Sequence, residues 1–178
     1  MLEVIKIRLA TSERPAAKRL VRFLKSLRAI ELPAPKALFL PLFTLHRTIA
    51  MLVGVSIRVL YWTPLFKSQL ASCGRKLFLD GGMPQIMGRL HIEFGDDVRI
   101  SGATSLAGRT GDHVPQLIVG SNIDIGWQTA ITVGTKVVIE DDVRMSGRST
   151  LSGYPGHPLN PDDRAKGLPD TSDQIGDI

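Results

Sequence analysis

An apolar side chain recurs at every sixth position through much of the second half of the chain, and this period constrains the fold more than any other feature. The repeat is clearest over residues 133–151, where Val133, Ile139, Met145 and Leu151 lie six residues apart. A six-residue period fits neither a helix of 3.6 residues per turn nor an ordinary hairpin sheet. It is typical of a solenoid in which each hexapeptide supplies one short strand and one corner.

The same ladder occurs upstream in two further runs, which are separated by a loop over residues 108–116. Their positions six residues apart are Phe94, Ile100 and Leu106, and then Val119, Ile125 and Ile131. The frame slips by two residues near Thr132. Three hexapeptides would form one triangular coil, whose inward aliphatic side chains stack on those of the next coil. We therefore predict a mainly β fold, a parallel β-helix over residues 76–178, preceded by an α-helical region over residues 1–75.

The ladder ends in a loop that contains Gly156-His157-Pro158, with Arg164 seven residues after the histidine and then Gly167. Together with the repeat, this loop resembles the hexapeptide-repeat acyltransferases, in particular the maltose, galactoside and nodulation-type O-acetyltransferases. The resemblance covers about half of the chain. It implies a left-handed β-helix, a homotrimer with active sites shared between neighbours, and acetyl transfer from acetyl-CoA to a saccharide hydroxyl. In that family further coils follow, so we expect the solenoid to be incomplete, or truncated, at Ile178.

The resemblance implies that His157 is the general base, because an imidazole titrates near neutral pH and can take the proton of an attacking hydroxyl. A lone histidine is also compatible with a solvent-exposed or packing role. Arg164 would hold the loop, face an acceptor or cofactor phosphate, or pair with Asp162 or Asp163. Trp127 interrupts a corner of the solenoid, where it would be a platform for sugar binding or a subunit-packing residue.

Metal and thiol chemistry are not expected. The γ-class carbonic anhydrases share the fold and bind zinc through three histidines, but here only His91 and His113 accompany His157, and no two are close in sequence. Cys73 is the one cysteine, which excludes an intrachain disulfide. We interpret it as a small apolar packing residue rather than a nucleophile.

The net charge of +5 is concentrated at the N-terminus, where residues 1–36 hold nine basic and three acidic side chains. A helix is predicted to start at Ser12-Glu13-Arg14-Pro15 and to run to Ile30, with one apolar face between basic residues. Such a helix either lies on an anionic membrane surface or packs on a partner helix with its charges in solvent. Nucleic acid is not an expected partner, because no binding motif is present.

Residues 37–66 are strongly apolar but contain Pro41, His46, Arg47, Arg58 and Pro64. No uncharged run approaches the ~18 to 20 residues of a membrane span. We predict a helix in the membrane interface, or a re-entrant hairpin, with both arginines facing headgroups. The alternative is a helix buried against the solenoid or another subunit.

These features predict a cytoplasmic enzyme that is peripheral on the inner face of the membrane. Its acceptor would be a surface polysaccharide or a lipid-linked sugar, and no cleaved signal peptide is expected. The alternative function is a non-catalytic, membrane-associated scaffold, in which the β-helix serves only for assembly.

Overall fold

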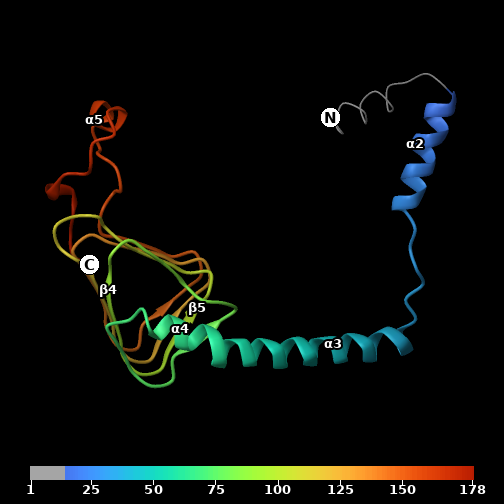
Figure 1. The fold of residues 1–178 in the computed structure, drawn as a ribbon, viewed down its shortest axis with the longest axis horizontal. Helices are drawn as coiled ribbons and strands as arrows, with labels where there is room; N and C mark the ends of the chain where they lie inside the picture. Colours follow the sequence, from blue (N-terminus) through green and yellow to red (C-terminus); the bar gives the residue numbers. More distant parts are fainter. Residues whose placement is uncertain (1–14) are drawn as a thin grey trace. The chain divides into compact units, whose positions relative to one another are not determined.

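The computed structural model describes residues 15–178, so the predicted helix start at Ser12 lies outside the described residues. The chain divides into two units, residues 1–48 and 49–178. Its N-terminal helices are α2 (Pro15–Arg28), α3 (Lys36–Ile57), a π-helical turn η1 (Arg58–Trp62) and α4 (Thr63–Lys67). The predicted re-entrant hairpin is absent from the described residues, because α3, η1 and α4 follow one another as a single helical segment (Figure 1).

The helix α2 has the predicted two-sided pattern, with leucine and phenylalanine on one face and lysine and arginine over the rest. None of its residues is buried. The helix α3 is apolar over most of its circumference, contains Pro41 and likewise buries no residue. The apolar face of each helix therefore lacks a partner among residues 15–178.

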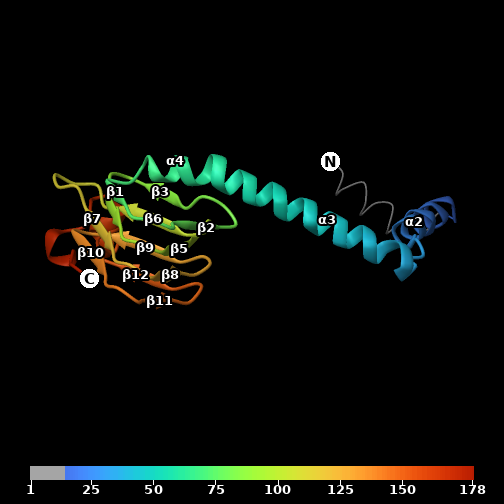
Figure 2. The ribbon, with the colours of Figure 1, turned by 90° about the horizontal axis from the view of Figure 1, so that it is seen from below.

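The second unit contains a solenoid of about four turns over residues 72–152, which confirms the predicted parallel β-helix and helical extension. Its left-handed winding stays a prediction. The strands form three parallel sheets, one along each side of the triangular coils (Figures 1 and 2). Sheet A contains β1 (Ser72–Cys73), β4 (His91–Phe94), β7 (Gln116–Val119) and β10 (Lys136–Ile139). Sheet B contains β2 (Phe78–Asp80), β5 (Val98–Ser101), β8 (Ile123–Ile125) and β11 (Arg144–Met145). Sheet C contains β3 (Gln85–Met87), β6 (Ser105–Gly108), β9 (Ala130–Val133) and β12 (Thr150–Ser152).

The coils are longer than the 18 residues that three hexapeptides would give. Gln116 pairs with Lys136 in the next coil, so one turn takes 20 residues (116 to 136). In this coil three residues connect β7 to β8, four connect β8 to β9 and two connect β9 to β10, so the corner between sheets B and C is the longest. Thr132 itself lies inside β9, so the frame slip is not at a corner. Ile131 and Val133 are both fully buried in β9, which explains why the six-residue spacing is lost there.

The prism is filled by the predicted aliphatic ladder, and one phenylalanine closes its N-terminal end. Ile100, Leu106 and Ile131 have no exposed surface. Phe66, from α4, is also fully buried, and its ring lies 6.0 Å from that of Phe94. The helical segment thus contributes Phe66 to the core of the solenoid. The first strand, β1, begins at Ser72, four residues before the predicted boundary at Lys76.

A polar ladder runs along the corner between sheets A and B, where one residue per coil has a left-handed backbone. These residues are Lys76, Asp97, Asn122 and Asp142, with φ from 58° to 64°. Asparagine and aspartate tolerate this conformation better than most residues. The first three each follow a glycine and one further residue, as Asp97 follows Gly95-Asp96. Gly95 is required because a Cβ there would lie within 2.7 Å of the backbone of Gly120.

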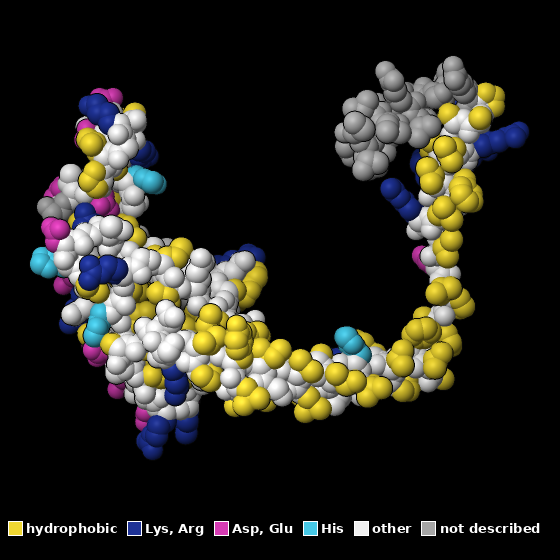
Figure 3. All heavy atoms as spheres, viewed as in Figure 1, with side chains coloured by type: hydrophobic (Ala, Val, Ile, Leu, Met, Phe, Trp, Pro, Cys, Tyr) yellow, Lys and Arg dark blue, Asp and Glu magenta, His cyan; other side chains and the backbone are white. Residues whose placement is uncertain are grey.

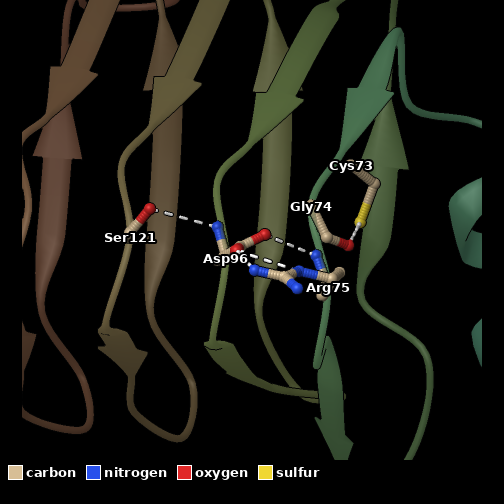
Figure 4. Close-up of polar contacts among 5 residues, drawn as sticks. All are labelled: Cys73, Gly74, Arg75, Asp96 and Ser121. Carbon is tan, nitrogen blue, oxygen red and sulfur yellow. Dashed lines mark hydrogen bonds and ion pairs between the residues drawn. The ribbon is translucent and has the colours of Figure 1, made fainter.

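Asp96 connects three coils at this corner (Figure 4). Its carboxylate accepts hydrogen bonds from the backbone N–H of Arg75 at 2.7 Å and from the Arg75 guanidinium at 3.0 Å. Its own N–H donates to the hydroxyl of Ser121 at 3.1 Å. The backbone and then the side-chain hydrogen bonds from Arg75 lower the pKa of Asp96, because they favour the ionised carboxylate.

An Asp96→Asn variant tests this assignment through pH. A carboxylate with a depressed folded pKa stabilises the fold above its unfolded value of about 3.9, and the contribution is lost as pH falls through the folded value. We expect wild type to have the higher urea midpoint at pH 7 and the difference to close below pH ~3.9. Asp112→Asn, in an exposed loop, is the control for the loss of one carboxylate and should leave the urea midpoint at pH 7 close to that of wild type. A difference that persists unchanged at low pH would contradict the role of the Asp96 charge.

Candidate functional site

Both long excursions of the solenoid leave from the same corner, between sheets C and A. The first joins β6 to β7 through residues 109–115, and the second follows β12 and carries the Gly156-His157-Pro158 loop. The second returns at Ile178, whose N–H and C=O bond to Lys136 and Val138 of β10. Figure 1 shows this second excursion, with the short helix α5 (Pro161–Ala165), projecting from the triangular coils.

The loop around His157 is held by its own side chains and backbone turns. Gly156 has a positive φ of 78° directly before the histidine, and Pro158 directly after it is buried. Asn160 caps α5 by accepting the N–H of Asp162 at 2.9 Å. The guanidinium of Arg164 donates to the carbonyl of Pro158 through Nε at 3.1 Å and Nη2 at 2.9 Å.

The contacts of Arg164 correspond to the loop-holding alternative for this residue. Among the described residues it forms no ion pair with Asp162 or Asp163. Its two donors converge on one carbonyl directly after His157, and this limits the movement of that residue. A lysine has one ammonium and could not reproduce the planar pair of bonds.

His157 itself is exposed and has no hydrogen bond or ion pair to any other described residue. Its imidazole nitrogens are therefore available to a substrate. A cavity of about 330 Å³ lies beside the loop. It is lined by residues that precede the loop in the sequence, including Tyr154 and Pro155, and by residues that follow it, including Asp177. Pro155 brings this cavity to within two residues of His157 in the sequence.

An ion pair that the sequence did not reveal joins the two excursions. Arg109 Nε lies 2.9 Å from Asp170 Oδ1, and Arg109 Nη2 donates to the Asp170 carbonyl at 3.2 Å. The side chain of Asp170 is 8% exposed and that of Arg109 is 22% exposed, so water screens this pair far less than the other pairs of the solenoid. Arg109 in turn donates its backbone N–H to Val133 O, on the intervening coil.

Replacing Arg109 with alanine tests whether this pair holds the His157 excursion against the solenoid. Breaking a largely buried pair leaves an uncompensated carboxylate, so we expect local opening of residues 153–176. The readout is limited trypsin digestion after the exposed Lys166, which should become at least about fivefold faster. Arg99→Ala, which removes the exposed Arg99–Asp80 pair at 3.2 Å, is the control. Equal cleavage of both variants and wild type would contradict the assignment.

Trp127 lies at a different corner of the prism from His157. It follows β8 at the corner between sheets B and C, is 52% exposed, and has the Arg148 guanidinium 5.1 Å from its ring centre. It lines an open cavity of about 400 Å³ together with Asp80, Arg99 and Asp124. Within one protomer the structure therefore does not bring Trp127 and His157 into one site.

The remaining reactive side chains form no further centre in the described part of the chain. His91 Nε2 lies 2.7 Å from Glu93 Oε1, and His113 is in the first excursion. Residues 15–178 contain no group of three metal-ligating side chains. Burial raises the pKa of the Cys73 thiol, so less of it is thiolate at neutral pH, as suits a packing residue.

Comparison with known proteins adds no family to this geometry. No protein-family model, no curated protein and no solved structure matches the chain significantly.

Proposed function

We propose that this protein is a CoA-dependent O-acyltransferase that transfers an acetyl group from acetyl-CoA to a saccharide hydroxyl. The observation that carries the proposal is the loop at the corner between sheets C and A. There His157 is exposed, has no hydrogen bond to another described residue, and lies next to a carbonyl that Arg164 fixes with two hydrogen bonds. The resemblance of this loop and its preceding repeats to the hexapeptide-repeat acyltransferases supports the same assignment.

In this reaction the neutral imidazole of His157 takes the proton of the saccharide hydroxyl as the oxygen attacks the thioester carbonyl carbon. The carbon–sulfur bond of the tetrahedral intermediate then breaks, and the proton passes from the imidazolium to the departing sulfur. The products are the acetyl ester and free CoA. Restraint of the loop contributes by holding the imidazole within hydrogen-bond reach of the hydroxyl.

The working site would form between protomers of a homotrimer. One protomer carries its histidine and its Trp127 cavity on different corners of the triangle. Cyclic symmetry places unlike faces of neighbouring copies in contact, so one copy would supply the histidine and the next the aromatic and acidic cavity. Indole faces and carboxylates suit the apolar faces and hydroxyls of a sugar. A surface polysaccharide or a lipid-linked sugar is the proposed acceptor class.

The full chain, incubated with acetyl-CoA and a panel of saccharides, tests this function through the release of free CoA thiol. Thiol release that depends on both acetyl-CoA and a saccharide is expected, together with trimers in solution. Intact trimers that neither bind CoA in calorimetry nor release thiol would overturn the enzymatic proposal and favour the scaffold alternative.

A further inference from the structure

The helix α3 leaves an apolar surface that nothing in the described chain covers. The helical segment from Lys36 to Lys67 has a most apolar window of mean hydropathy 1.7, and none of that window is buried. Apolar side chains cover the face of α3 that Figure 3 shows. Soluble monomers rarely expose such a surface, and a 22-residue helix is about 33 Å long, close to the thickness of a bilayer core.

The hydroxyl groups of α3 are satisfied without water. Thr44 donates to Leu40 O at 3.0 Å, Thr48 to Thr44 O at 3.0 Å, and Ser56 to Leu52 O at 2.9 Å. Hydrocarbon offers no hydrogen-bond partner, so polar groups within it must be paired inside the protein. Together with the backbone bonds of the helix, these contacts make α3 suited to a lipid environment.

The charges of α3 indicate how it would lie in lipid. Lys36 and Arg47 are eleven residues apart, close to three helical turns, and therefore lie along one stripe. Arg47 falls halfway along the helix, a costly position at the centre of a bilayer but not at its surface. The guanidinium of Arg58 lies 4.0 Å from the ring centre of Phe78 on β2. That Arg58 also faces headgroups stays a prediction.

Basic residues occur on both sides of α3. The N-terminal side has Lys18, Arg19, Arg22, Lys25 and Arg28 in α2, and the C-terminal side has Arg58, Lys67, Arg75 and Lys76. Basic residues that flank an apolar helix favour the anionic cytoplasmic surface of a membrane. Because both ends of α3 have such residues, both ends are expected on the same side of the membrane. The two-sided α2 has the charge and apolar face that bind such a surface.

We propose that α3 is embedded in one leaflet of an anionic lipid bilayer, with its Lys36–Arg47 stripe toward the headgroups. In this arrangement α2 lies on the surface and both ends of α3 face the same aqueous side. This membrane attachment is independent of the acyl transfer proposed above.

Flotation of the full chain with phosphatidylcholine–phosphatidylglycerol vesicles, compared with phosphatidylcholine alone, tests the embedding. Leu45 lies roughly half a turn away from the charged stripe and points deepest into lipid, whereas Met51 lies one turn beyond Arg47 on the stripe. Leu45→Lys should lower the vesicle partition coefficient at least about tenfold, and the control Met51→Lys less than about threefold. Wild type should bind the anionic vesicles more strongly and stay bound at high salt. Equal effects of the two lysines, or a wild-type chain that does not float, would overturn the proposal.

Labelling of single cysteines distinguishes one-leaflet embedding from a membrane span. In a Cys73→Ala background, Ala29→Cys and Ser68→Cys place exposed thiols on either side of α3. In sealed membrane vesicles, a membrane-impermeant maleimide should label both of these cysteines or neither of them. Labelling of only one position would show a span and overturn the one-leaflet arrangement. If an alkaline wash released the chain from the membrane in a complex with a second protein, a protein rather than lipid would cover α3, and the proposal would be overturned.

Discussion

Replacing His157 with alanine is expected to lower kcat for acetyl transfer by about 10²- to 10⁴-fold, the usual contribution of a positioned general base. The effect should fall on kcat more than on KM, because the imidazole acts on the proton that moves in the transition state. The fold should be unaffected, since the side chain is exposed and has no partner among the described residues. Thiol release measured over a range of acceptor concentrations separates the two parameters.

The matched control is His113→Ala. His113 is also an exposed histidine in an excursion from the corner between sheets C and A, but it lies outside the Gly156-His157-Pro158 loop. It should retain wild-type turnover. Wild-type turnover of the His157 variant, with unchanged circular dichroism, would show that another group is the base.

A Phe66→Ala variant is expected to lose about 3 to 5 kcal/mol of unfolding free energy. Phe66 closes the N-terminal end of the prism, is fully buried, and meets the ring of Phe94 at 6.0 Å with the planes tilted by 54°. Removing it leaves a cavity over the first coil, and the inward side chains below would lose both contacts and protection from water. Urea denaturation followed by tryptophan fluorescence measures the change, since Trp62 packs against the same core.

Leu65→Ala provides the comparison for this variant, because Leu65 is the preceding residue of α4 and is 41% exposed. It should cost well under half as much. A Phe66 variant as stable as the Leu65 variant would mean that α4 is not the cap of the solenoid and that the first coil is closed in another way.

The core of the fold could be predicted from the sequence because the pattern that encodes it is local and periodic. Ile100, Leu106 and Ile131 were placed inward by their spacing alone, and all three are fully buried. The spacing did not give the length of a coil. One turn takes 20 residues instead of 18, and in the sequence this appeared only as a slip of frame near Thr132.

The candidate site was predictable only in part. Gly156-His157-Pro158 was recognised from its residues, and the exposure of His157 leaves that prediction open to test. The position of Trp127 on another corner was not foreseen, since it depends on which sheet each repeat joins. The sheet that a repeat joins follows from the number of residues in one coil, and the six-residue spacing alone did not give that number.

The sequence by itself determined the parallel solenoid, its inward ladder and the exposed loop, because each depends on residues close together in the chain. Only the tertiary structure showed that both excursions leave from one corner, that Arg109 reaches Asp170 across 61 residues, and that Phe66 caps the prism. Contacts of this kind follow no period. They arise because stacking successive coils brings distant segments to one edge, and their partners are chosen by the geometry of the coils rather than by neighbours in the sequence.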